Sequence, residues 1–263
     1  MSSKQTTLDI VLAGLMTQYS NRVPDVSKII SAMINKNIIN SQTDIINDHI
    51  AFRTFAHPYL GIRSLEKIFS YYGYKKRDFY EFKTKKLNAY WFSPPKESIN
   101  LPRLFISECK LTELSKPTQE IINSYLKTLT SDPVDKLDLN NGHDVDSFLH
   151  TSLWHQPTWE DYQAVLAESE YAAWVLYNRY YLNHFTITIH KLTQNYNTIK
   201  KFNSFLESIG IKLNHAGGKV KISADKKLHQ SSTVAQSVPT LFTHKNGSQK
   251  THTIAGSYVE FAE

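Results

Sequence analysis

Cysteine and glycine are scarce in this chain of 263 residues, which contains one cysteine, Cys109, and 9 glycines. A single cysteine excludes an intrachain disulfide, a zinc site built from several thiolates and a CxxC redox pair. The glycines amount to about half the number that the usual frequency of about 7% predicts. No GxGxxG, GxxxxGK(S/T) or GxSxG motif can be formed from them. Dinucleotide-binding enzymes, P-loop nucleotidases and hydrolases with a nucleophile elbow therefore lack their signatures here.

Long runs of one residue kind are also missing. The most apolar N-terminal stretch, Ile10 to Met16, is far shorter than the roughly 18 residues of a membrane span, and no small-residue cleavage site follows it. The net charge is +6, but the lysines are dispersed among acidic and aromatic residues and form no long basic run. We therefore expect a soluble, cytoplasmic protein that binds neither nucleic acid nor a membrane, although the positive net charge favours anionic partners in general.

The hydrophobic pattern divides the chain into four segments. Residues 1–46 form an N-terminal helical segment, and residues 47–110 form a first module with a strand, a helix and three further strands. Residues 111–181 form a helical insertion, and its middle, residues 130–158, has the composition of a polar loop. Residues 182–263 repeat the pattern of the first module with little identity. We predict an α+β fold in which two βαβββ modules form a curved sheet around a metal pocket.

The first strand of each module carries an early histidine on a polar face. His49 and Arg53 share a face, because they are four positions apart on a strand with a period of two. His184 begins the corresponding strand of the second module, and Tyr258 and Glu260 share a face of the last strand. If these faces converge, two histidines and one carboxylate form a facial triad that leaves positions on Fe(II) open for a substrate and O₂. The alternative is that each histidine is hydrogen-bonded on its strand and binds no metal.

Four blocks of the sequence resemble the 2-oxoadipate dioxygenase/decarboxylase family, whose fold is similar to that of the vicinal oxygen chelate proteins. They occur in the family's order, and the resemblance extends from about Asp44 to the end of the chain. The chain resembles a short member, since characterised members have further sequence after the last block. The blocks are NDHIAFRTF at 47–55, NHFT at 183–186, QSST at 230–233 and SYVEFAE at 257–263.

The resemblance implies an Fe(II) enzyme that converts 2-oxoadipate, with O₂ and with loss of CO₂, to 2-hydroxyglutarate in lysine catabolism. It also implies that His49, His184 and Glu260 bind the metal and that Arg53 binds the substrate. A guanidinium suits this role, because it can hold the distal carboxylate of a diacid through two charge-assisted hydrogen bonds, which a lysine cannot. The alternative for Arg53 is a structural ion pair on its strand.

Three further polar residues, Gln230, Ser232 and Tyr258, are candidates for contacts with the metal ligands or the substrate, or for ordinary hydrogen bonds to the backbone. Two other functions stay open. The first is a non-catalytic protein of the same fold that binds an anion or a metal. The second is a divalent-metal isomerase or hydrolase, in which Glu108 would mirror Glu260 and complete a four-ligand site. An oxygenase needs only three protein ligands, and for Glu108 we favour a structural role.

Overall fold

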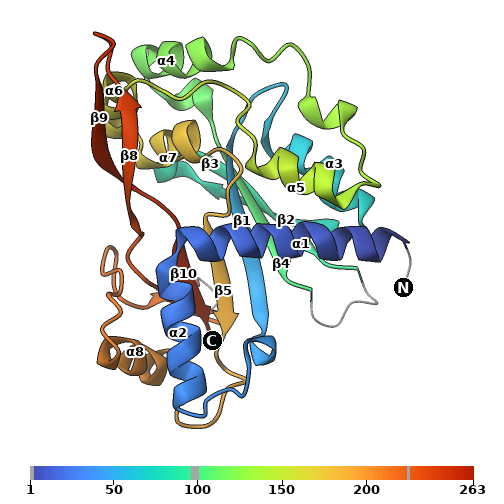
Figure 1. Ribbon diagram of the computed structural model, residues 1–263, viewed down its shortest axis with the longest axis vertical. Coiled ribbons are helices and arrows are strands. Elements are labelled where there is room, and N and C mark those ends of the chain that lie inside the picture. Colours follow the sequence, from blue (N-terminus) through green and yellow to red (C-terminus); the bar gives the residue numbers. More distant parts are fainter. Residues whose placement is uncertain (1–2, 96–100, 224–225) are drawn as a thin grey trace.

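The computed structural model describes residues 3–95, 101–223 and 226–263, and a curved sheet of eight strands forms its centre (Figure 1). The strands of this sheet are β1 (Asn47–Phe55), β2 (Lys75–Phe82), β3 (Leu87–Ser93), β4 (Arg103–Cys109), β5 (His184–Thr188), β6 (Lys221–Ile222), β7 (His229–Ser232) and β10 (Tyr258–Ala262). A separate hairpin consists of β8 (Ser237–Thr243) and β9 (Gln249–Ala255). The helices are α1 (Ser3–Arg22), α2 (Pro24–Asn35), α3 (Gly61–Tyr71), α4 (Lys116–Leu126), α5 (Gly142–His150), α6 (Trp159–Glu168), α7 (Glu170–Asn178) and α8 (Ile199–Ser208).

The strand order β2-β3-β4-β1-β5-β10-β7-β6 repeats one arrangement on either side of the seam between β1 and β5. β1 runs parallel to β4, β5 runs parallel to β10, and β1 and β5 are antiparallel. Parallel neighbours cannot be joined by a tight turn, and each pair has a helix between its strands in the chain, α3 in the first half and α8 in the second. The predicted α+β fold of two βαβββ modules around a curved sheet is confirmed, with the β8–β9 hairpin inserted in the second module before β10.

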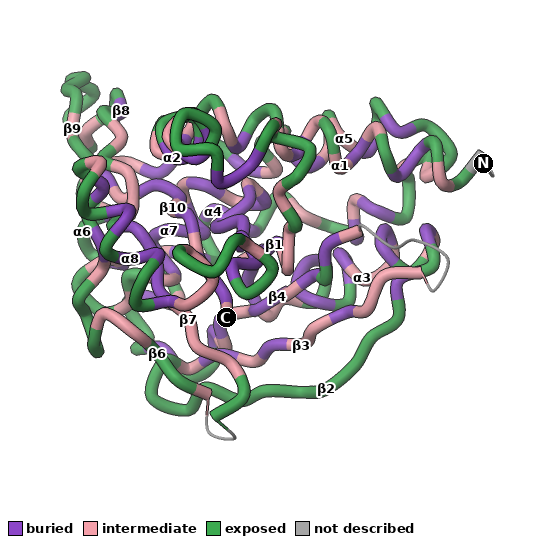
Figure 2. Tube along the Cα trace, turned by 90° about the horizontal axis from the view of Figure 1, so that it is seen from below, coloured by how far each residue is buried: buried purple, intermediate pink, exposed green. Residues whose placement is uncertain are grey.

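The two faces of the sheet differ in chemistry because side chains alternate along each strand. On the helix-covered face, the ring of Phe52 on β1 packs against Phe69 of α3, with centroids 5.4 Å apart. Phe261 on β10 packs in the same way against Phe202 of α8, at 5.1 Å. All four rings are fully buried, whereas β2 at the edge of the sheet is exposed along its length (Figure 2). The opposite face, which carries His49, is left for polar side chains.

The N-terminal helices close the apolar side of the second half. Tyr19 of α1 lies edge-on to Phe185 of β5, with ring centroids 6.2 Å apart, and its hydroxyl donates a hydrogen bond to the carbonyl of Tyr258.

Across the described ranges, no helix is both long enough and apolar enough for a membrane span.

The prediction that Glu108 mirrors Glu260 is wrong. In the register of the parallel pairs, His49 lies opposite Arg103, and His184 lies opposite Tyr258. Superposing the two histidines therefore places Glu260 at the position of Phe105 in the first half. Glu108 is three positions further along β4, so its side chain points to the face opposite His49 and cannot complete a four-ligand site.

Glu108 instead binds the start of a helix. Its carboxylate accepts a hydrogen bond from the backbone N–H of Ile62 in α3 at 2.8 Å. The residue that superposes on it, Glu263, accepts a hydrogen bond from the backbone N–H of Ile199 in α8 at 2.6 Å. A carboxylate at a helix N-terminus satisfies a free N–H group and interacts favourably with the helix dipole. The favoured structural role of Glu108 thus has a physical basis that both halves share.

The polar stretch at residues 130–158 contains helix α5, where the sequence predicted a loop. The side chain of Asn141 accepts hydrogen bonds from the backbone N–H groups of His143 and Asp144, and so caps the helix. The polar residues that indicated a loop are the N-terminal cap of this helix, which is why the composition was misleading.

Candidate metal centre

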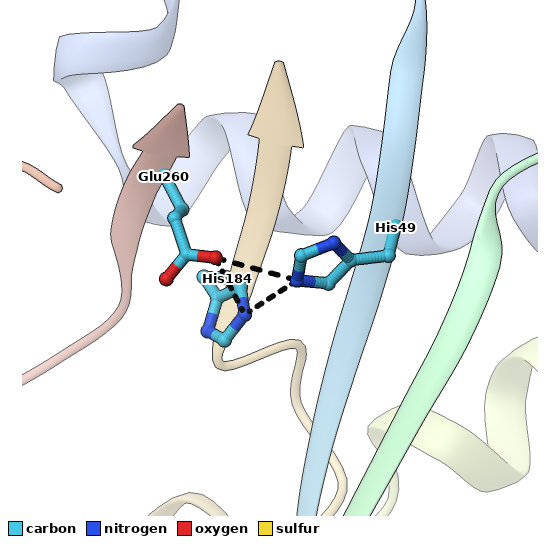
Figure 3. A group of neighbouring side chains, drawn as sticks. All are labelled: His49, His184 and Glu260. Carbon is cyan, nitrogen blue, oxygen red and sulfur yellow. Dashed lines mark hydrogen bonds and ion pairs between the residues drawn. The ribbon is translucent and has the colours of Figure 1, made fainter. Parts of the chain in front are cut away.

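Three strands bring His49, His184 and Glu260 together at the seam of the sheet (Figure 3). β5 lies between β1 and β10, and its Thr186 is paired with His49 on one side and with Glu260 on the other. Residues paired across a sheet point to the same face, and His184 shares that face because it is two positions from Thr186. The three predicted ligands therefore meet because of strand register and alternation.

The three ligand atoms are close enough to bind one ion. His49 Nε2 is 3.3 Å from His184 Nε2 and 3.4 Å from Glu260 Oε1, and His184 Nε2 is 3.9 Å from the same oxygen. Two donors that each bind an ion at about 2.1 Å can be at most about 4.2 Å apart, and all three separations are below this limit. Two imidazoles and one carboxylate are also a donor set that suits Fe(II). The residues present fit the metal that the resemblance implies.

A polar side chain fixes the orientation of each imidazole. Asp48 accepts a hydrogen bond from His49 Nδ1 at 2.9 Å, and its other oxygen accepts one from Arg103 Nη1, also at 2.9 Å. Asn183 Oδ1 accepts a hydrogen bond from His184 Nδ1 at 2.9 Å. With the proton on Nδ1, each ring directs the lone pair of Nε2 at the common centre, which is the arrangement that metal-binding histidines use.

The two histidines have different electrostatic environments. Burial opposes the charge of His49, but its hydrogen bonds with Asp48 and Glu260 outweigh this effect and raise its pKa to about 9. Burial lowers the pKa of His184 to about 4. Burial also opposes the charge of Glu260, yet the two histidines hold the pKa of this carboxyl below its usual value. With its pKa of about 9, His49 is protonated at neutral pH and faces the Glu260 carboxylate at 3.4 Å, so a cation that binds here would displace the Nε2 proton of His49.

Two of the three additional polar residues predicted from the sequence touch a ligand. Gln230 Nε2 donates a hydrogen bond to Glu260 Oε1 at 2.6 Å. The ring of Tyr258 stacks on that of His184, with centroids 4.9 Å apart. Ser232 lies opposite Glu260 in the register of β7 and β10, but its hydroxyl forms no hydrogen bond with the described residues of the centre.

Arg53 lies on a cavity of about 420 Å³ that is also lined by His184 and Tyr258. No carboxylate of the described chain is within ion-pair distance of its guanidinium, which lies over the rings of Tyr171 and Trp174 at 4.9 Å and 5.2 Å from their centroids. The predicted alternative, a structural ion pair on the strand, is therefore not formed. The cavity combines the edge of the candidate metal centre with a cation that is free to bind an anion.

Sequence reasoning missed the residues that orient the ligands. Neighbours on a regular strand point to opposite faces, so the residue before a histidine is not expected to reach its ring. Asp48 does so because the register of β1 and β5 shifts between Asn47 and His49, and Asn183 does so because it precedes β5. The signal that could have revealed them is the pair of dipeptides Asp-His and Asn-His at equivalent points of the two modules.

The curved sheet with a three-residue centre at its seam belongs to the glyoxalase, or vicinal oxygen chelate, fold. A solved structure described as a putative glyoxalase superfamily protein from Ralstonia eutropha JMP134 superposes with a TM-score of 0.78 over 94% of this chain and 79% of that chain. The two sequences are 17% identical, so this likeness concerns the fold.

The family model of 2-oxoadipate dioxygenase/decarboxylase matches residues 11–263, and the chain belongs to this family of oxygen-using, decarboxylating enzymes. It is 40% identical over 262 residues to the chloroplastic 2-oxoadipate dioxygenase/decarboxylase of Arabidopsis thaliana. This alignment covers 96% of this chain and 67% of that protein. It is 44% identical over 230 residues to the chloroplastic/amyloplastic protein of Oryza sativa subsp. japonica, covering 83% of this chain and 59% of that protein. The chain thus spans 59% to 67% of the length of these relatives.

A solved structure of the hydroxyglutarate synthase from Oryza sativa, in complex with 2-oxoadipate, superposes with a TM-score of 0.83 and is 37% identical. The superposition covers 100% of this chain and 82% of that chain. The names of both plant relatives place those proteins in plastids. For this chain, the cytoplasmic location stays a prediction.

Proposed function

We propose that this protein is an Fe(II)-dependent dioxygenase and decarboxylase that converts 2-oxoadipate and O₂ to 2-hydroxyglutarate and CO₂, as a step of lysine catabolism in the cytoplasm. The observation that carries the proposal is the position of Arg53, a cation without an ion-pair partner in the described chain, on the same cavity as His184 of the triad. Membership of the family and the likeness to a structure that contains 2-oxoadipate support the same substrate.

His49, His184 and Glu260 are the residues that would hold the metal. Bound Fe(II) would supply adjoining positions at which a 2-oxo acid and O₂ meet, together with the redox step. Asp48 and Asn183 keep the two imidazoles in the tautomer that directs Nε2 at the ion. Three protein donors leave the remaining positions free, which is the requirement for a substrate that chelates.

Arg53 would orient the substrate by its far end. A 2-oxo diacid has one carboxylate beside the keto group and a second at the end of a short chain. With the keto end at the triad, the second carboxylate would reach Arg53 and accept two parallel hydrogen bonds from its guanidinium. Half-buried Tyr258, which contacts both His184 and Arg53, would cover the chain between the two ends.

The reaction balances without any further reactant. The carboxylate next to the keto group leaves as CO₂, and the keto carbon becomes the new carboxylate. One oxygen atom of O₂ enters this carboxylate, and the other becomes the hydroxyl group on the neighbouring carbon. The electrons that reduce O₂ come from the cleaved carbon–carbon bond and from the hydroxylated C–H bond.

The test is anaerobic reconstitution with Fe(II), followed by measurement of O₂ uptake with a panel of 2-oxo acids. The panel contains 2-oxoadipate, the shorter diacid 2-oxoglutarate, the longer diacid 2-oxopimelate and the monoacid 2-oxohexanoate. The proposal expects uptake with 2-oxoadipate to be fastest and to yield 2-hydroxyglutarate. Binding of the diacid without O₂ uptake would favour a non-catalytic binding protein, and turnover without O₂ would favour a metal isomerase or hydrolase; either result would refute the proposal.

A further inference from the structure

Two aromatic rings of helix α7 hold the guanidinium of Arg53. The ring centroids of Tyr171 and Trp174 lie 4.9 Å and 5.2 Å from its central carbon. The two residues are three positions apart, so they project from the same side of the helix. α7 packs against β1, the strand that carries Arg53. Cation–π contacts of this kind stabilise a charge without neutralising it.

Both rings are fixed by hydrogen bonds at their polar ends. The hydroxyl of Tyr171 donates to the backbone carbonyl of Ser107 at 2.7 Å and lies 2.8 Å from the hydroxyl of the same residue. The indole N–H of Trp174 donates to the carbonyl of Gly256, just before β10, at 3.0 Å. One ring is thus attached to the first half of the sheet and the other to the second half. The two rings together restrict the orientation of Arg53, whose guanidinium also forms a hydrogen bond with the hydroxyl of Tyr258.

A competing carboxylate lies on the same cavity. Glu170 precedes Tyr171 in the chain and lines the cavity together with Arg53, yet no ion pair joins the two in the described structure. Glu170 is exposed, and an arginine that could turn toward it would form a charge-assisted pair with it. Such a pair would occupy the fork that an anionic ligand needs. The two rings therefore keep Arg53 both charged and available.

We propose that Tyr171 and Trp174 are positioning residues that hold Arg53 away from Glu170 and thereby give the site its preference for diacids over monoacids. The inference rests on the proposed function, because Arg53 is assigned there to the distal carboxylate. It explains why Arg53 forms no ion pair with a carboxylate of this cavity. It also assigns the positioning of Arg53 to helix α7, which lies in the insertion between the two modules.

The test compares binding of a diacid and a monoacid to protein that holds a redox-inert ion. Zn(II)-loaded protein is titrated calorimetrically with 2-oxoadipate and with 2-oxohexanoate, so that affinity is measured without turnover. Tyr171→Leu should weaken 2-oxoadipate binding about 10-fold, which is the scale of a partly desolvated cation–π contact, and leave the monoacid unchanged. Adding Glu170→Gln to Tyr171→Leu should restore most of the diacid affinity, because the competing carboxylate is gone.

Two further variants distinguish an effect on Arg53 from a general loss of folding. Trp174→Phe keeps a ring but removes the hydrogen bond to Gly256, and should lower the diacid preference less than Tyr171→Leu does. Tyr181→Leu removes the ring beneath Arg22, a contact of 3.9 Å outside the cavity lining, and should leave the preference unchanged. Thermal melting of each variant establishes that it is folded before it is titrated.

The outcomes separate the two proposals. A wild-type preference for the diacid that persists in Tyr171→Leu, or that Glu170→Gln does not restore, would refute the positioning role while the proposed function stands. A wild-type protein without any preference for the diacid would refute the proposed substrate, and the positioning role with it. Loss of the preference in Tyr171→Leu and its return in the double variant is the result that we expect.

Discussion

The two halves of the sheet use one framework for different chemistry. Each half begins with a strand that carries a histidine, and each histidine has a polar partner on its Nδ1 atom. In the first half the partner is the carboxylate of Asp48, and in the second it is the amide of Asn183. The second half also supplies Glu260, where the first half has Phe105. The comparison teaches that a near-symmetric fold makes a one-sided centre through a few substitutions on one face.

The largest effect is expected from removing a ligand of either half. His49→Ala, His184→Ala and Glu260→Ala should each lower Fe(II) affinity by more than about 100-fold, since even the outer partners of metal ligands contribute 10- to 100-fold. Metal content after reconstitution and desalting, measured by mass spectrometry, checks this. His215→Ala, at an exposed position, is the control. Full iron content in any of the three variants would disprove the shared centre.

Arg53 is the feature of the first half that has no cationic counterpart in the second, where Thr188 superposes on it. Arg53→Lys should raise the KM for 2-oxoadipate about 10- to 100-fold, the value of one lost charge-assisted hydrogen bond. The KM for 2-oxohexanoate should not change, because the monoacid has no distal carboxylate. Steady-state O₂ uptake with both acids measures this. An equal rise for both acids would contradict the assignment.

The two Nδ1 partners offer the most direct test of the comparison itself. Asp48→Ala and Asn183→Ala should each weaken metal binding about 10-fold or more, because the ring is no longer oriented. Asp48→Asn makes the first half resemble the second, and should cost less than Asp48→Ala because a hydrogen-bond acceptor stays. Competition with a chelator gives the dissociation constants. Equal affinities for Asp48→Asn and Asp48→Ala would show that only the charge matters.

The helical insertion is attached to the first half through Glu168. This carboxylate accepts hydrogen bonds from Ser115, and it pairs with Lys86 at 3.0 Å; these contacts lower its pKa to about 2. A carboxyl with a lowered pKa stabilises the fold above its ordinary value near 4.5, and this contribution is lost as the pH falls from there toward 2. We expect about 1 kcal/mol, because the pair is partly open to solvent.

Chemical denaturation of the wild type and of Glu168→Gln between pH 7 and pH 3 measures this contribution. The two proteins should differ most at pH 7 and begin to converge below about pH 4.5, because the carboxyl of the unfolded chain then takes up a proton while that of the folded protein stays ionised. A difference that is constant with pH would show that Glu168 acts through packing and not through its charge.

The smallest effect is expected where the halves are most alike. Glu108→Gln and Glu263→Gln weaken equivalent contacts with the first turns of α3 and α8, and each should destabilise the fold by about 0.5–1 kcal/mol without changing metal affinity. Urea unfolding measures both, and metal titration is the control. A loss of iron in Glu108→Gln would mean that this residue takes part in the centre after all.

The fold, and the strand faces that carry His49, His184 and Glu260, could be predicted because both depend on alternation along single strands. The apolar and polar faces of β1, β5 and β10 are visible in the sequence. Residues of β1 that are an even number of positions from His49 share its face. The pairing of strands is not visible in this way. Glu108 was matched to Glu260 by residue type, and the register showed a displacement of three positions, which reverses the face.

The other residues of the site depend on irregular backbone or on tertiary packing. Asp48 reaches the ring of His49 because the register of β1 and β5 shifts between Asn47 and His49, and no local sequence pattern predicts such a shift. Tyr171 and Trp174 lie in a helix rich in aromatic residues, where core packing is the ordinary expectation. Only the docking of α7 against β1 brings them over Arg53, so their role could not be predicted from sequence.

The central claim is that O₂ and 2-oxoadipate react at the His49, His184 and Glu260 centre. The most direct measurement is turnover of 2-oxoadipate by the Fe(II)-reconstituted protein under O₂ labelled with heavy oxygen, with mass analysis of the product. The account predicts 2-hydroxyglutarate that carries both heavy atoms, one in the new carboxylate and one in the hydroxyl group. A product without heavy oxygen, or one that forms equally well under argon, would contradict it.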